Sequence, residues 1–193
     1  MFLGMGELIL IRHGETAWSR TGQHAGRTDL PLTEAGEAAA RALAPRLAGR
    51  EFVAVYSSPL TRAVRTAELA GLSGAENDAD LIEWNYGRYE GLTAKQIQEL
   101  KPGWELWRDG VDAGEDLGHV TVRVDAFLGR VRPLLDKGDV AVVAHGHLSR
   151  ILTARWLGLD ASDARQFGHP HPGTINTLGY EHGLPVVLGW NVP

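Results

Sequence analysis

The sequence predicts an α/β fold, a three-layer α/β/α sandwich with helices on both faces of a mostly parallel central sheet. Two observations carry this prediction. Short apolar runs rich in β-prone residues occur at 8–11, 52–56 and 140–144. Between them lie segments whose apolar residues recur three and four positions apart, the spacing of amphipathic helices. Strands that alternate with helices in this way usually pair in parallel, because each helix returns the chain across the sheet.

The helices of the first half have recognisable start signals. Thr33 is the expected N-cap of a helix that runs to Leu47. After the second strand, Ser57-Ser58-Pro59 offers hydroxyl caps and a proline suited to a first helical turn. A helix over about 60–69 is therefore expected to follow that strand directly.

The second half continues the alternation and ends in two strands. Apolar residues keep a 3.6-residue spacing from Leu117 to Leu135, which predicts a helix over that range. After the third apolar run, residues from about 148 to 157 have the pattern of another helix. The tail predicts strands at 175–180 and 186–190, joined by a turn at Glu181-His182-Gly183.

The length of 193 residues fits one domain over 1–193, and no internal repeat, low-complexity segment or linker interrupts it. The least regular stretch, about 84–118, is rich in Trp, Tyr, Gly and Arg. Long irregular segments in compact domains are often functional. We expect this one to be a lid-like excursion rather than a second domain.

Composition excludes several classes of protein. With 24 Asp and Glu against 19 Lys and Arg, the net charge is −5, which argues against a nucleic-acid binder and a polybasic membrane anchor. The absence of cysteine excludes disulfides, thiolate nucleophiles and Cys-based zinc sites. No apolar run is long enough for a transmembrane helix, and no basic segment precedes the first strand. A cytoplasmic location is expected, with a homodimer among the options for the assembly.

Polar residues follow the predicted strands at their carboxyl ends, where open α/β sheets bind ligands. The first strand leads into Arg12-His13, and the second leads through 57–61 to Arg62. Leu81-Ile82 leads to Glu83, and the last buried strand leads to His145-Gly146-His147. These ends are expected to share one crevice.

The segments RHGETAW, SSPLTRAVRTAEL, IEWNYGRYEGL and VAHGHLSRIL together resemble the histidine phosphatase superfamily, also called the phosphoglycerate mutase-like superfamily. The motifs stand in the order of that family and cover most of the chain. The chain's short length and the segments QHAGRTDLPLT and GTINTLGYEH are similar to its small bacterial phosphatases. The resemblance implies the phosphoglycerate mutase-like form of the α/β/α fold.

The resemblance also implies roles for individual residues. It makes His13 the nucleophile, which would become a phosphohistidine, and Glu83 the proton donor. It gives Arg12, Arg62 and His145 the task of holding the phosphoryl group. Two further substrate-binding residues are expected. Gly146 follows the second histidine, and Ser19 lies where many relatives carry Asn.

The chemistry of these residue types supports such roles. A neutral imidazole can attack phosphorus and divide a difficult hydrolysis into two easier steps. Guanidinium groups bind phosphate oxygens through several planar donors, and a charged His145 is expected to complete a cage around them. Cations of this kind replace Mg²⁺, and the sequence has no carboxylate cluster suited to a metal. We therefore expect no metal and no cofactor. Gly14 is expected to let the phosphate approach the backbone.

Several residues have alternative interpretations. Glu15 or Glu90 could take the acid role in place of Glu83. His147 could shape the pocket or lie on a helix surface. The segment His169-Pro170-His171 is interpreted as a plain loop rather than a metal site.

Trp104, Trp107 and Arg108 form the other open case. They could be a small hydrophobic patch under the excursion, or a lid that recognises the leaving group, and the second interpretation is slightly favoured.

The leading functional prediction is a metal-independent phosphatase that hydrolyses phosphate monoesters of small metabolites. A cofactor-dependent phosphoglycerate mutase would use the same residues, but it generally needs a longer insertion between Glu83 and His145 than this chain has. A non-catalytic phospho-ligand-binding protein is the third option. It is disfavoured because both the predicted nucleophile and the predicted acid are present.

Overall fold

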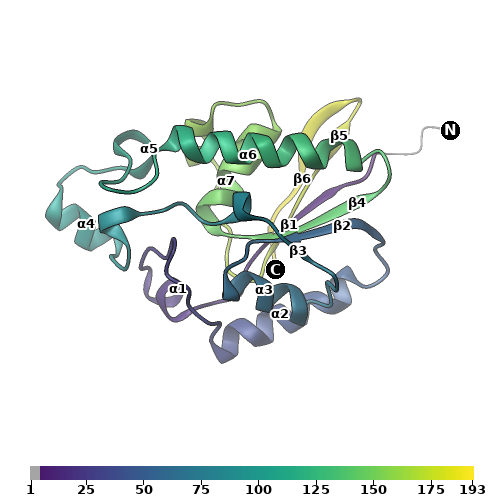
Figure 1. Cartoon of the computed structure of the whole chain (residues 1–193), viewed down its shortest axis with the longest axis horizontal. Coiled ribbons are helices and arrows are strands. Elements are labelled where there is room, and N and C mark those ends of the chain that lie inside the picture. The colour runs from purple at the N-terminus through teal and green to yellow at the C-terminus, as the bar shows by residue number, and fades with distance from the viewer. Residues whose placement is uncertain (1–4) are drawn as a thin grey trace.

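The computed structural model describes residues 5–193 and contains a six-stranded mixed sheet (Figure 1). The strand order is β3-β2-β4-β1-β5-β6. The four strands from β3 to β1 pair in parallel, whereas β5 and β6 are antiparallel to their neighbours. The strand bounds are β1 Leu8–Arg12, β2 Phe52–Ser57, β3 Glu76–Asn77, β4 Asp139–Ala144, β5 Ile175–Glu181 and β6 Leu184–Val192. The predicted mostly parallel sheet is confirmed.

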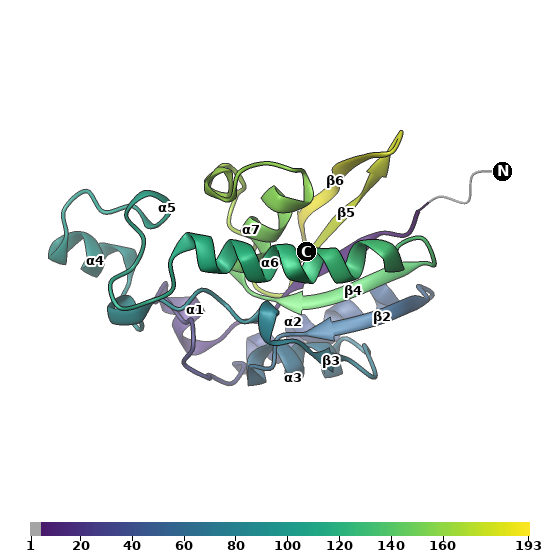
Figure 2. The same cartoon turned by 45° about the horizontal axis from the view of Figure 1, so that its top comes forward.

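Two pairs of helices cover the two faces of the sheet (Figures 1 and 2). The helices α2 (Glu34–Leu47) and α3 (Thr61–Leu69) lie on one face, and α6 (Leu117–Val131) and α7 (Gly146–Trp156) lie on the other. All five residues of β1 are buried, and alternate ones belong to different cores. Leu8 and Leu10 pack with α6 and α7, whereas Ile9 and Ile11 pack with α2 and α3. A strand buried on both faces reads as a continuous apolar run for this reason.

The remaining helices are short. Three of them gather at the end of the molecule toward which the arrowheads of β2 and β4 point (Figure 2). These three are α1 (Ala17–Thr21), α4 (Ala94–Leu100) and α5 (Leu106–Asp109). The 3₁₀ turns are η1 (Ala79–Leu81), η2 (Gly87–Tyr89), η3 (Arg132–Leu134) and η4 (Ala161–Gln166). Within residues 5–193, no helix has the length and apolar character that crossing a bilayer requires.

Two helix boundaries differ from those expected. The predicted helix over 117–135 is divided, because Pro133 lacks an N–H and the chain tightens into η3 after Val131. The helix expected from residue 148 begins at Gly146, two residues earlier. Its first turn is stabilised from elsewhere in the chain, since the carboxylate of Glu83 accepts N–H bonds from His147 and Leu148. Thr33 caps α2 as expected, accepting from the amide of Gly36.

Leu81-Ile82 does not end a strand, so that prediction is wrong. The short strand β3 ends at Asn77, and Asp78 then caps the 3₁₀ turn η1. Arg123 of α6 donates to the carbonyl oxygens of Asp80 at 2.6 Å and Ile82 at 2.5 Å, which removes them from any strand ladder. The same guanidinium forms a bidentate pair with Glu115. Glu83 is therefore positioned by the partly buried side chain of Arg123 and not by the sheet.

The irregular segment 84–118 packs its apolar side chains onto the core. Trp84 is fully buried, and Ile97, Trp104 and Leu106 are buried as well. The indole Nε1 of Trp84 donates to the carbonyl of Glu115 at the far end of the segment. This contact closes the segment into a loop whose inner side is apolar.

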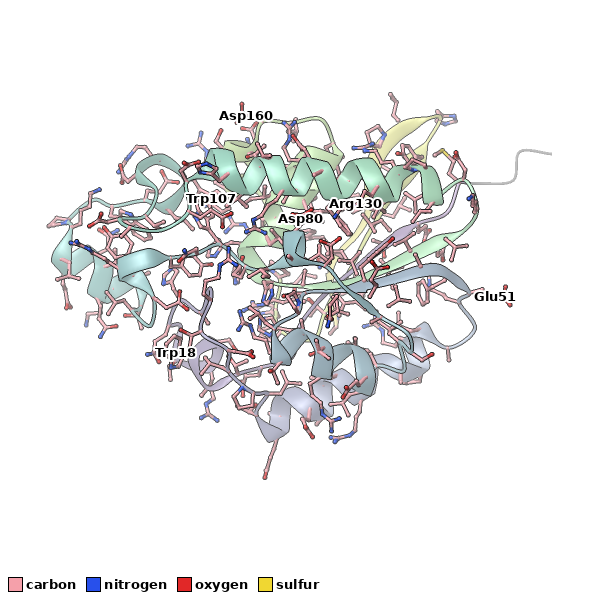
Figure 3. The ribbon with its side chains drawn as sticks, viewed as in Figure 1. Trp18, Glu51, Asp80, Trp107, Arg130 and Asp160 are labelled. Carbon is pink, nitrogen blue, oxygen red and sulfur yellow. The ribbon has the colours of Figure 1, made fainter. Side chains whose placement is uncertain are left out.

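Replacing Arg123 by Gln is expected to destabilise the fold far more than replacing Arg130 by Gln. Both arginines lie on α6 and reach η1, and Figure 3 shows Asp80 beside Arg130. The Arg123 side chain is 12% exposed, and within residues 5–193 its loss leaves Oε1 of Glu115 and the carbonyls of Asp80 and Ile82 without a donor. We expect a loss of about 2–4 kcal/mol for Arg123→Gln and below about 1 kcal/mol for the exposed Arg130. Urea denaturation measures both, and equal losses would contradict this view of Glu83 placement.

Candidate active site

A pocket of about 350 Å³ opens at the carboxyl edge of the parallel strands. Five of the predicted site residues line it: Arg12, His13, Ser19, Glu83 and Gly146. Residues that the sequence did not single out complete the wall, among them Thr16, Gln23, His24 and Tyr86. Arg62 and His145 do not line the pocket. They lie fully buried behind His13, and the rings of His13 and His145 meet edge to face with centroids 5.0 Å apart.

His13 follows β1 and is fixed in one tautomer. Its Nδ1 lies 2.7 Å from the carbonyl oxygen of Gly14, which can only accept, so Nδ1 carries the proton. The lone pair of Nε2 is then free. Burial lowers the pKa of His13 well below its ordinary value, and the positive charges of Arg62 and Arg12 lower it further. The ring is neutral at physiological pH, which is the nucleophilic form.

Gly14 has a different role from the one expected. A Cβ at this position would lie 2.4 Å from the carbonyl oxygen of Gly36 in α2, so a side chain would push the helix away. The amide of Gly14 also donates to Thr66 of α3. Gly14 therefore lets β1 end close against α2 and α3, and this packing sets the position of His13.

The guanidinium of Arg12 has unused hydrogen-bonding capacity at the pocket. Its Nη1 donates to the carbonyl of Pro170, whereas its buried Nε has no partner in the part of the chain that the structure describes. Burial lowers the pKa of Arg12 to about 10, and the side chain remains charged at neutral pH. A buried donor without a partner on a permanent cation is suited to an anionic ligand.

Arg62 is surrounded by protein acceptors. Its Nε donates to Nδ1 of His145 at 3.3 Å, and its Nη1 and Nη2 donate to the carbonyls of Thr28, Ala25 and Gly26. These four bonds use four of the five N–H groups of the guanidinium. Burial lowers the pKa of Arg62 below its ordinary value, while nearby carboxylates oppose that shift. Arg62 holds the loop 25–28 and His145 in place.

His145 is neutral in this arrangement, whereas the charged form was expected for a site that holds phosphate oxygens. Because Nδ1 accepts from Arg62, the ring proton is on Nε2 and donates to Oγ of Ser58 at 2.8 Å. Burial lowers the pKa of His145 well below its ordinary value, and Arg62 and His13 add to the effect. Ser58 was expected only to cap a helix. Its hydroxyl orients this ring and also accepts from the amide of Leu60 at 3.4 Å, at the start of α3, and no sequence signal distinguishes it from Ser57.

Glu83 is the carboxylate that lines the pocket. It is 4% exposed, and its Oε1 accepts from the amides of Trp84 at 3.0 Å and Leu148 at 2.9 Å. Its Oε2 accepts from the amide of His147 at 3.0 Å. The alternative acids are occupied elsewhere. Glu15 accepts from the hydroxyl of Thr33, and Glu90 accepts from the amides of the loop 25–28.

Gly146 and Ser19 occupy the expected places with different contacts. The Gly146 amide has no hydrogen-bond partner within residues 5–193 and is the first of α7, where the helix dipole favours an anion. A Cβ there would lie 2.4 Å from Cε1 of His169, so only glycine allows that ring to pack against the helix. The hydroxyl of Ser19 is already part of a capping box with Thr16.

Histidines form much of the remaining wall of the pocket. His24, His147, His169 and His171 all line it, so His147 belongs to the pocket and not to a helix surface. The rings of His147 and His169 have centroids 5.0 Å apart. In the described residues 5–193, no group of three or more His, Cys, Asp or Glu side chains is placed to hold a metal ion.

The tryptophans of the excursion lie behind this wall. Trp107, near the N-terminal end of α6 in Figure 3, packs edge to face on His147 with centroids 5.5 Å apart. Trp104 lies 6.2 Å from the ring of His24. Arg108 is exposed and pairs with Asp109, away from the pocket lining. The two indoles support the histidines from the protein side.

The fold and this pocket together define an enzyme that acts on phosphoryl groups. The model of the "Histidine phosphatase superfamily (branch 1)" matches residues 8–193, and the chain belongs to this superfamily. It is 41% identical over 180 residues to an acid phosphatase of Mycobacterium tuberculosis, covering 92% of this chain and 88% of that protein.

Solved structures give the same result. A structure of an open reading frame product of Mycobacterium tuberculosis matches with a TM-score of 0.91, 38% identity and 97% coverage of both chains. A mycobacterial glucosyl-3-phosphoglycerate phosphatase, solved with VO3, matches with a TM-score of 0.84 and 30% identity over 97% of this chain and 100% of that one. The chain is a phosphatase of the histidine phosphatase family.

The stability of the fold is expected to decrease as the pH falls below about 6.5, and His13→Asn is expected to weaken this dependence. The pKa of His13 is lowered well below 6.5 in the folded chain, so below pH 6.5 only the unfolded chain binds its proton. The free energy of unfolding then falls by up to about 1.4 kcal/mol per pH unit for this group. The Asn amide replaces Nδ1–H without titrating. Urea denaturation at pH 5, 6 and 7 measures the free energy of unfolding of both proteins. The same change with pH in the wild type and in His13→Asn would refute this expectation.

Proposed function

We propose that this chain is a metal-independent phosphomonoesterase that acts on small phosphorylated metabolites through a phosphohistidine on His13. The observation that carries the proposal is the Nε2 lone pair of a neutral, buried His13 beside the Nε of Arg12, two groups without a partner within residues 5–193. A nucleophile and a cation with one unused N–H donor then meet at one pocket, which also contains a carboxylate.

In the first step the Nε2 lone pair forms an N–P bond while the P–O bond to the alcohol breaks. The alcohol oxygen keeps the electron pair of that bond and takes a proton from Glu83. Arg12 and the Gly146 amide are the groups that would hold the phosphoryl oxygens. Arg62 and His145 lie behind His13, and the charge of Arg62 adds to the positive potential there.

In the second step a water oxygen attacks phosphorus and gives its proton to Glu83. The N–P bond breaks, its electron pair returns to Nε2, and inorganic phosphate leaves. Glu83 is again protonated, so the cycle closes without a metal or a cofactor. A mutase would differ only in that a second alcohol, and not water, accepts the phosphoryl group.

His13→Ala is expected to abolish turnover of phosphate esters in the presence of EDTA, because the N–P bond can no longer form. Inorganic phosphate release measures this, and an alkaline quench of the wild type should trap acid-labile phosphohistidine. His119→Ala is the matched control, since that histidine is exposed and does not belong to the pocket lining. Turnover that persisted in His13→Ala would refute the nucleophile assignment. Conversion of 3- to 2-phosphoglycerate with added bisphosphoglycerate, faster than phosphate release, would favour the mutase.

Glu83→Gln is expected to slow hydrolysis of alkyl phosphates by about 10²–10⁴-fold, the usual contribution of a general acid. Hydrolysis of p-nitrophenyl phosphate should suffer much less in the phosphorylation step, because p-nitrophenolate leaves without a proton. Gln keeps the size of the side chain, but its amide nitrogen cannot accept the N–H bonds that one carboxylate oxygen accepts, a loss that affects both esters alike. Single-turnover rates with both esters measure the loss for each and show whether it depends on the leaving group. Equal losses for the two would show that Glu83 acts in some other way.

A further inference from the structure

Two histidines of the pocket wall are fixed in opposite tautomers. Nδ1 of His24 lies 2.8 Å from the carbonyl oxygen of Leu92. A carbonyl oxygen only accepts, so Nδ1 of His24 carries the proton and its Nε2 presents a lone pair. Nε2 of His24 has no hydrogen-bond partner within residues 5–193, and the ring lines the pocket. His24 is therefore an acceptor toward a ligand.

His147 presents a hydrogen-bond donor to the pocket, whereas His24 presents an acceptor. Its Nδ1 lies 2.5 Å from the hydroxyl of Tyr86, which has no other partner in the described chain. Burial raises the pKa of Tyr86 well above its ordinary value, so the hydroxyl keeps its proton, and because Nδ1 of His147 is its one partner in the described chain, it donates that proton to Nδ1. Burial also lowers the pKa of His147 well below its ordinary value, which keeps the ring neutral. Its single proton is then on Nε2, and His147 is a donor toward a ligand.

The surroundings hold this pair rigidly. The two rings are parallel within 2°, with centroids 6.1 Å apart. Tyr86 packs edge to face on both of them, at 4.8 Å from His24 and 5.7 Å from His147. Trp107 packs on His147 from the protein side. One acceptor and one donor on a fixed wall match hydroxyl groups, which both donate and accept.

The pocket offers little to a second anionic group. Arg12 is the one arginine or lysine in the described lining, and it is placed for the phosphoryl group. The nearby Arg150 is committed elsewhere, since its guanidinium lies 4.8 Å over the Trp107 ring and donates to the carbonyls of Ala164 and Arg165. A carboxylate or second phosphate on the alcohol would lose water without gaining a permanent cation.

We propose that His24 and His147 form hydrogen bonds with the hydroxyl groups of the leaving alcohol, so that the preferred substrates are monophosphates of uncharged polyols and sugars. This inference rests on the proposed phosphatase activity and specifies its substrate class. The nucleophile, Arg12 and Glu83 act on the phosphoryl end of the ester. The histidine pair recognises the other end.

The test compares glycerol 3-phosphate with propyl phosphate, which has the same chain length and no hydroxyl groups, and with 3-phosphoglycerate, which carries a carboxylate. We expect kcat/KM for glycerol 3-phosphate to exceed that for each of the others by about tenfold or more, the effect of one or two hydrogen bonds. His24→Phe and His147→Phe should each lower the ratio of glycerol 3-phosphate to propyl phosphate toward one. His147→Gln keeps an N–H donor and should retain more of the ratio than His147→Phe.

His119→Ala, an exposed histidine outside the pocket, is the control and should leave the ratio unchanged. Equal kcat/KM for glycerol 3-phosphate and propyl phosphate in the wild type would overturn this inference alone, even if the Phe variants did not fold. Faster turnover of 3-phosphoglycerate would do the same. Failure to hydrolyse any of the three esters would overturn the proposed function and this inference with it.

Discussion

The site depends on the buried charge of Arg62. A guanidinium removed from water costs several kcal/mol unless its N–H groups are paired, and four of the five are paired here with the loop 25–28 and His145. The loop is held from its other side by Glu90, whose Oε1 accepts from the amides of Gly26 and Thr28. One cation thus joins the start of α3, the end of β4 and the loop that follows α1. His24, which precedes that loop, is held separately, by the carbonyl oxygen of Leu92 and the amide of Gly91.

Burial lowers the pKa of His13 and His145, and the buried cations lower these pKa values further. Arg12 and Arg62 lie close enough to His13 to lower its pKa beyond the effect of burial. The imidazole of His13 is therefore neutral and not charged. In the proposed reaction the same two arginines would supply the positive potential that an incoming phosphate dianion needs. A proposed nucleophile that remains neutral and a pocket that remains cationic would then be consequences of one arrangement. Neither would survive if the arginines were exposed, because water would screen their charge.

The sequence predicted those parts of the site that follow from strand ends. Arg12 and His13 lie where the apolar run of β1 stops, and His145 and Gly146 lie where β4 stops, so hydrophobic patterning located them. The sequence wrongly predicted that a strand end positions Glu83. Arg123, which does so through its bonds to the carbonyls of Asp80 and Ile82, is distant in the chain, and these bonds leave no signal in the sequence around residues 81–82. Glu90 and Ser58 were missed as supports for the same reason. Their partners are set by tertiary contacts, which periodicity does not encode.

The N-terminus of α7 connects the two halves of the proposed chemistry. Its amides at His147 and Leu148 donate to Glu83, whereas the amide of Gly146 remains available to the pocket. When Glu83 gives its proton to the departing alcohol, negative charge develops on a carboxylate that already faces three N–H donors. Donors oriented before the reaction stabilise that charge without rearranging. The same helix end would hold phosphoryl oxygens through Gly146, so one helix terminus stabilises charge on both the acid and the transferred group.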